Sequence, residues 1–88
     1  MQMPILSRHA RVRCAQRGLR KRDVWYVLKH GTRIYRNGAV HYFLRRRDIP
    51  PADRKRYERL NGTGVVVSLD HSRIITVYRN RAKMPKAA

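Results

Sequence analysis

Apolar residues at the start of the chain recur with the period of an α-helix. Within residues 8–17, Ala10 and Cys14 stand four positions apart and, with Ala15 beside them, are expected to form a narrow buried stripe between basic residues. Ser7, directly before this segment, is a favourable N-cap, and Gly18 after it suits the left-handed conformation that ends many helices. The pattern predicts a first helix over this segment.

The same period continues over residues 21–30 with larger side chains. Val24, Val27 and Leu28 stand at positions i, i+3 and i+4, so they lie on one side of a helix. The glycine that follows the segment ends the pattern. The sequence predicts a second helix, joined to the first by a tight turn. Trp25 is expected to pack in the core or at the helix edge and not to serve as a stacking platform.

The pattern then changes to that of a β-hairpin. Residues 32–36 (TRIYR) and 39–45 (AVHYFLR) are rich in β-branched and aromatic side chains. Between them lie Asn37 and Gly38, which tolerate the positive φ angles of a type I′ turn. Two antiparallel strands are therefore expected after the helices.

A second hairpin is expected near the end of the chain, from residues 64–69 (GVVVSL) and 73–79 (RIITVYR). The connection over residues 45–63 is charged and interrupted by prolines, and it predicts an excursion with one short helical turn after Pro51. A chain of 88 residues has room for one compact domain.

The element order ααββββ predicts an α+β fold, in which two N-terminal helices pack on a four-stranded antiparallel sheet. This single domain is expected over residues 1–80. Residues 81–88 are basic and predict a flexible tail.

Charge narrows the choice of partner. The chain has 22 lysine and arginine residues against 5 acidic ones, a formal net charge of +17. So large an excess in so short a chain is relieved most readily by a polyanion, which means RNA, DNA or an acidic protein. Arginine dominates the cations, and its planar guanidinium suits phosphate better than the ammonium of lysine does.

The sequence lacks the features of a membrane protein, of a disulfide-bonded protein and of a metal-binding protein. We find no long apolar run and no secretory leader, so we expect no membrane partner and a cytoplasmic location. Cys14 is the single cysteine, which excludes an intramolecular disulfide, and the four histidines lack the spacing of metal ligands. Neither a metal nor a cofactor is predicted.

Two motifs carry a resemblance that covers nearly the whole chain. The opening motif consists of Ser7, His9, Ala10, Arg13, Arg17 and Gly18, and the closing motif consists of Ile75, Thr76, Val77 and Tyr78. Together they resemble a family of small bacterial domains of unknown function, grouped with the barnase, EndoU, colicin and RelE superfamily of metal-independent ribonucleases, many of them toxins. The resemblance implies a RelE-like fold and an RNA-cleaving ancestry. Arg20 departs from the family, which usually has a serine before the second helix.

The first helix carries candidate catalytic residues. His9, Arg13 and Arg17 stand at i, i+4 and i+8, so they form one slowly drifting stripe on the helix. Metal-free RNA cleavage needs groups that move protons and cations that stabilise the charge on phosphorus, and histidine and arginine supply both. His41 in the second predicted strand is a candidate for a second acid or base. The alternative interpretation is a solvated helix face and a surface histidine.

Two further groups are candidates for binding nucleic acid. Arg20, Lys21 and Arg22 stand at the start of the second helix, where the helix dipole disfavours cations and an external anion would relieve the cost. Asp23 in the first turn offsets part of it. In the last strand we expect Ile75 and Val77 to face the helices, and Thr76 and Tyr78 to line the opposite face, where a ring can stack on a base. Arg79 extends this candidate surface.

Three functions fit these residues. The first is a toxin-type ribonuclease that cleaves RNA by transesterification to a cyclic phosphate. The second is a non-catalytic module that binds RNA, DNA or the ribosome through the same basic surface. The third, compatible with the first, is a basic protein held by an acidic, antitoxin-like partner. Charge supports all three, so the sequence leaves open whether the protein is an enzyme.

Overall fold

Both predicted helices form at the start of the chain. A computed structural model describes residues 3–80, and the predicted basic tail lies outside them. Helix α1 spans Arg8–Gln16 and helix α2 spans Lys21–His30. The Ser7 side chain accepts a hydrogen bond of 3.0 Å from the Ala10 N–H, and Gly18 adopts a φ of 65°, so the predicted cap and stop both operate. The domain is α+β, as expected.

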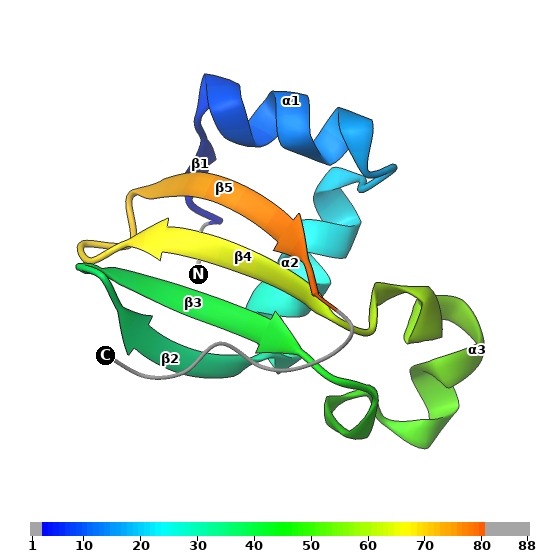
Figure 1. Ribbon diagram of the computed structural model, residues 1–88. Coiled ribbons are helices and arrows are strands. Elements are labelled where there is room, and N and C mark those ends of the chain that lie inside the picture. The colour runs from blue at the N-terminus through cyan, green and yellow to red at the C-terminus, as the bar shows by residue number, and fades with distance from the viewer. Residues whose placement is uncertain (1–2, 81–88) are drawn as a thin grey trace.

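The sheet has five strands, not four, so the predicted ααββββ order and purely antiparallel sheet are wrong in this detail. The strand order is β1-β5-β4-β3-β2, and β1 runs parallel to β5 at the sheet edge (Figure 1). A strand of two residues has no periodicity, and only its pairing with β5 reveals it. The strands are β1 (Ile5–Leu6), β2 (Thr32–Arg36), β3 (Ala39–Leu44), β4 (Thr63–Ser68) and β5 (Arg73–Arg79).

The predicted hairpin turns are present. Asn37 and Gly38 join β2 to β3 with φ angles of 52° and 71°, the positive values that a type I′ turn requires. The second hairpin joins β4 to β5 through a turn in which His71 has a φ of 61°. These local signals set the antiparallel part of the sheet.

A β-bulge in β5 changes which side chains face the helices. Val66 pairs with Thr76 whereas Val67 pairs with Ile74, so Ile75 is the extra residue. Ile75 is exposed, and the fully buried Ile74 takes the inward position. Our expectation that Ile75 faces the helices is therefore wrong, because strict alternation fails across a bulge. The expectation for Val77 is confirmed, since it is buried in the core.

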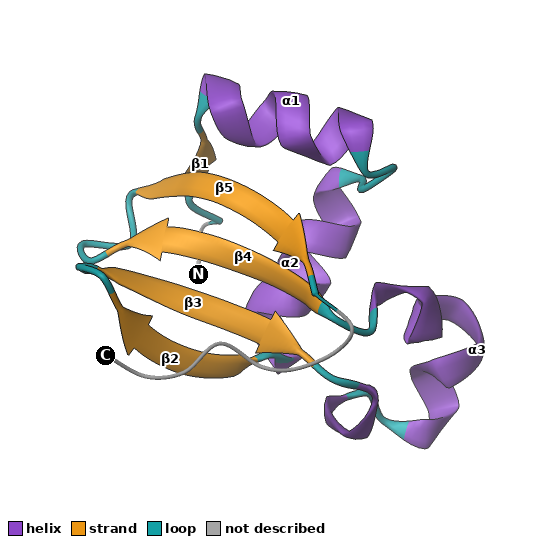
Figure 2. Cartoon of the chain, viewed as in Figure 1, coloured by secondary structure: helices purple, strands orange, loops and turns teal. Residues whose placement is uncertain are grey.

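The hydrophobic core lies between the helices and one face of the sheet. Helix α1 runs along β5, and α2 lies across the back of the sheet as viewed in Figure 2. Both helices and the strands contribute to one apolar cluster. Its most buried members are Ala10, Val24, Val27, Leu44, Leu60, Val65, Val67 and Ile74.

The excursion between the hairpins is more structured than the single helical turn we expected. It contains helix α3 (Arg54–Tyr57) and 3₁₀ turns at Arg46–Asp48, Pro51–Asp53 and Glu58–Leu60. Leu60 is fully buried in the core. The burial of this leucine anchors the excursion to the domain.

Two side-chain clamps tie the excursion to α2. Arg59 forms a bidentate ion pair with the buried Asp23, at 2.7 and 3.2 Å. The Tyr26 hydroxyl donates a 2.9 Å hydrogen bond to Asp53, and the rings of Tyr26 and Tyr57 stack with centroids 3.8 Å apart. Both partners of each clamp are far apart in sequence, so neither clamp follows from local pattern.

Candidate functional site

The sheet presents a second face to which neither α1 nor α2 packs. In a sheet, cross-strand partners share a face and neighbours along a strand alternate. Tyr42 and Val65 pair with each other on the helix side, so His41 and Val66, which also pair, lie on the opposite side. We call this the second face, and it carries Ile34, Arg36, Ala39, His41, Phe43, Gly64, Val66, Thr76 and Tyr78.

His41 and Tyr78 meet on the second face, although β4 separates their strands. The His41 Nδ1 lies 3.4 Å from the Tyr78 hydroxyl, and the ring centroids are 6.1 Å apart. The Tyr78 ring crosses the sheet over Gly64, where a Cβ atom would overlap it. Phe43 borders the same ring with centroids 6.3 Å apart. A glycine in the middle strand thus allows two candidate residues to come together.

The electrostatics of this pair are set by burial and by Arg36. Burial lowers the pKa of His41, and the positive charge of Arg36 lowers it further, against a backbone hydrogen bond to Arg36 that raises it. Burial also raises the pKa of Tyr78, and Arg36 opposes that shift. At neutral pH, His41 is therefore a neutral imidazole able to accept a proton, and Tyr78 keeps its hydroxyl proton.

Arg36 is a residue that the sequence reasoning missed. Arg36 precedes the Asn37–Gly38 turn and pairs with Ala39. Ala39 lies two positions before His41 in β3, so Arg36 projects to the same face as His41. The hairpin register contained this signal, because a two-residue turn sets which residues pair. Arg36 adds a cation beside the His41–Tyr78 pair.

The predicted stripe on α1 lies apart from this cluster. His9 and Arg17 are exposed, and Arg13 donates a 3.4 Å hydrogen bond to Gln16. Helix α1 packs against the helix side of the sheet, so His9 and His41 lie on opposite sides of it. No hydrogen bond or ring contact among residues 3–80 joins His9 to His41.

The positive charge at the start of α2 is partly neutralised by the Asp23 carboxylate. The buried Asp23 carboxylate accepts a 2.9 Å hydrogen bond from the Arg20 backbone N–H. Burial alone would raise the pKa of Asp23, but the hydrogen bonds from Arg59 and from the Arg20 backbone outweigh burial and lower it. Asp23 is thus ionised at neutral pH and offsets the cations there. The side chains of Arg20, Lys21 and Arg22 remain exposed.

Of the three candidates in β5, two share the second face. Thr76 and Tyr78 pair with Val66 and Gly64, which places both on the side of His41. Arg79 pairs with Thr63 on the other side, and its guanidinium donates a 2.6 Å hydrogen bond to the Arg59 carbonyl oxygen. Arg79 therefore secures the excursion as well as adding charge.

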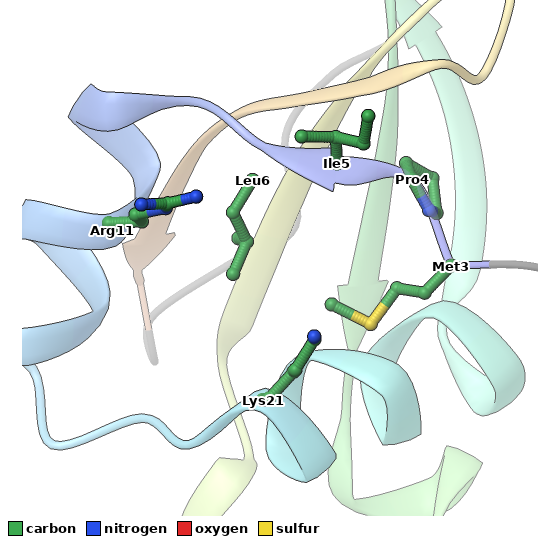
Figure 3. A pocket seen from close by; sticks show the side chains of 6 residues that line it. All are labelled: Met3, Pro4, Ile5, Leu6, Arg11 and Lys21. Atoms are coloured by element: carbon green, nitrogen blue, oxygen red, sulfur yellow. The ribbon is translucent and has the colours of Figure 1, made fainter.

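A hollow lies between β1 and the first turns of the two helices. Its lining combines the apolar residues 3–6 with Arg11 from α1 and Lys21 from α2 (Figure 3). Among residues 3–80, no group of three histidine, cysteine or acidic side chains is placed to hold a metal ion. No helix in the same range has the length and apolar character needed to cross a membrane.

Comparison with family models, with curated proteins and with solved structures finds no match for this chain. The resemblance to the ribonuclease superfamily consequently stays a prediction from two sequence motifs. What the chain does is therefore inferred from the geometry of the second face and from the distribution of charge.

Proposed function

We propose that this protein is a metal-independent ribonuclease of toxin type, which cleaves RNA by transesterification on the second face of its sheet. The observation that supports the proposal most is the contact of 3.4 Å between His41 Nδ1 and the Tyr78 hydroxyl, beside the charge of Arg36. A neutral histidine, a protonated tyrosine and an arginine are a sufficient set of groups for this reaction.

Each group has one role. His41 takes the proton of the RNA 2′-hydroxyl as its oxygen attacks phosphorus and forms the 2′,3′-cyclic phosphate. The bond from phosphorus to the 5′-oxygen breaks, and the Tyr78 hydroxyl protonates the departing oxygen. Arg36 stabilises the negative charge that develops on the phosphate oxygens. His41 then returns its proton to Tyr78 across the hydrogen bond that joins them, so the cycle closes without a metal ion.

The +17 charge supports two wider proposals about partners. A polyanionic substrate such as RNA would be attracted to the whole molecule before the second face engages it. An acidic, antitoxin-like protein would be attracted by the same charge and would compete with RNA. A module that binds RNA without cleaving it is the alternative function, and the exposed cations of α1 and α2 favour it as much as they favour an enzyme.

The test separates cleavage from binding and the two histidines from each other. Purified protein in excess chelator should convert an RNA oligonucleotide into fragments ending in a 2′,3′-cyclic phosphate and leave the matching DNA whole. His41→Ala should lower the rate roughly a hundredfold or more, the usual contribution of one proton-transfer group. His9→Ala is the matched control, because it removes the same chemistry from α1.

The alternatives give different results. Loss of rate in His9→Ala with full activity in His41→Ala would place the reaction on the α1 stripe with Arg13 and Arg17. Loss in both variants would require residues on both sides of the sheet. If intact protein binds RNA but cleaves none, the non-catalytic module is the better description. Circular dichroism and the melting temperature of each variant show whether it is folded.

A further inference from the structure

Helix α2 carries an aromatic ring between two cations on its outer side. Lys21, Trp25 and Lys29 stand at i, i+4 and i+8, so they follow one another along the helix at intervals of about 6 Å. All three are exposed, and Trp25 has a relative exposure of 36%. Trp25 therefore lies at the helix edge, one of the two positions expected for it, where it is partly packed and partly accessible.

The hollow beside β1 extends this stripe. Lys21 belongs to both, and Figure 3 shows its side chain and that of Arg11 reaching toward the hollow from different helices, with Arg11 beside Leu6 and Lys21 below it. The stripe of α2 and the hollow together offer three cations, an indole ring and an apolar floor. We call this surface the α2 stripe, made of Arg11, Lys21, Trp25 and Lys29.

Among residues 3–80, no carboxylate forms an ion pair with a cation of the α2 stripe. Each of the five acidic residues already has a partner elsewhere in the described chain. Asp23 pairs with Arg59, Asp48 with Arg45, Glu58 with Arg46, Asp53 accepts from Tyr26, and Asp70 accepts from Ser68 and Ser72. None of the three ion pairs includes a residue of the stripe. An external anion is therefore the partner that its charge fits.

We propose that the α2 stripe binds a single-stranded segment of RNA, with one base stacked on Trp25 and the flanking phosphates held by Lys21, Lys29 and Arg11. A ring between cations is the arrangement that single-stranded nucleic acid recognises, because every base has a face to stack and every linkage carries a charge. An acidic protein segment would pair its carboxylates with the cations, but it carries no base to stack on the exposed indole. The choice of RNA rests on the proposed function, but the site lies on the other side of the sheet from His41.

Because Trp25 is the single tryptophan of the chain, its fluorescence measures whether a ligand occupies the α2 stripe. A short 2′-O-methyl oligoadenylate resists cleavage and should quench the tryptophan fluorescence of the wild-type protein. An abasic oligonucleotide of the same length should bind through its phosphates and quench little. Equal quenching by both, or by polyglutamate, would mean that the site recognises charge without a base and would overturn the proposal.

Variants test the stacking step with a labelled oligoadenylate. Trp25→Leu should weaken binding about fivefold to a hundredfold, the range for loss of one stacked base, and Trp25→Phe should recover part of it. Tyr35→Leu is the matched control, because Tyr35 is an exposed aromatic residue that also lies near an arginine, with Arg33 6.0 Å from its ring centroid. Trp25→Leu and Tyr35→Leu with equal affinities would overturn the proposal.

These experiments distinguish failure of the α2 stripe proposal from failure of the ribonuclease proposal. Cleavage of RNA by a protein whose tryptophan fluorescence does not respond to the oligoadenylate refutes the α2 stripe alone. Base-dependent quenching without cleavage refutes the ribonuclease alone. Deoxyoligoadenylate in a parallel titration shows whether the site distinguishes RNA from DNA.

Discussion

At the scale of single residues, the proposed cleavage depends on how the fold adjusts the protonation of His41. Its side chain is half-buried, and both burial and the charge of Arg36 lower its pKa. A base with a lowered pKa stays deprotonated further into the acidic range, so it remains able to accept a proton there. The same cation that would stabilise the phosphate in the transition state also keeps the base neutral.

The proposed cleavage should depend on pH through this arrangement. The rate should rise as pH increases through the pKa of His41, with its midpoint below the ordinary histidine value of about 6.5. Arg36→Gln should lower the rate and move this midpoint to higher pH, because a positive charge beside the imidazole has been removed. The measurement is a pH–rate profile under single-turnover conditions. Arg36→Lys keeps the charge and should keep the midpoint, so a shift in both variants would contradict the electrostatic explanation.

At the scale of secondary-structure elements, the first turn of α2 is a compromise between stability and charge. Arg20 occupies the N-cap position with extended backbone angles and makes no side-chain cap. Asp23 compensates by accepting a hydrogen bond from the Arg20 N–H. A serine at position 20 would complete the reciprocal pair of hydrogen bonds known as a capping box. The arginine therefore costs the helix a favourable cap.

Arg20→Ser should stabilise the protein and weaken its binding to RNA. The new hydroxyl accepts a hydrogen bond from the Asp23 N–H, which is worth about 0.5–1 kcal/mol and should raise the melting temperature by several degrees. Arg22→Ser is the control, because it removes an equal charge without adding a cap and should stabilise less. Thermal unfolding and RNA affinity are measured on both. Lower stability with unchanged affinity in Arg20→Ser would show that the Arg20 side chain is a structural partner.

At the scale of the whole molecule, the acidic residues lie in internal contacts, whereas many of the basic residues lie exposed on the surface. The acidic residues are all engaged in internal contacts, and they hold the excursion and the turns in place. Most of the cations on α1 and at the start of α2 are exposed, as is His9. The few negative charges are thus engaged in internal contacts, and the cations of α1 and of the start of α2 are largely exposed to solvent.

Binding to RNA should consequently fall steeply as the salt concentration rises. A plot of log affinity against log salt should be linear, with a slope of about −0.7 for each phosphate neutralised on a single strand. The double variant Arg11→Ser/Lys21→Ser should reduce the magnitude of the slope by up to about 1.4. Arg46→Ser is the control, because the Arg46 guanidinium pairs with Glu58 at 3.0 Å. A slope near zero for the wild-type protein would remove the basis of both nucleic-acid functions.

The sequence by itself determined the features that depend on near neighbours. Both helices follow from the spacing of Ala10 and Cys14 and of Val24 and Val27, because each helix is stabilised by contacts three or four residues apart. The first hairpin follows from the positive φ angles that Asn37 and Gly38 tolerate. The net charge of +17 needs no structure at all. These signals are local or additive, so one chain was sufficient to obtain them.

Only the tertiary structure decided which distant residues meet. Strand β1 becomes recognisable through its pairing with β5, and the bulge that exposes Ile75 is defined by the register of β4 against β5. His41 and Tyr78 are 37 positions apart, and their contact across the glycine of β4 depends on two strand registers at once. Long-range register reflects the packing of the whole core, and residue spacing along the chain does not encode it. For that reason the sequence identified His41 and Tyr78 only as separate candidates, and the fold shows that they lie together beside Arg36.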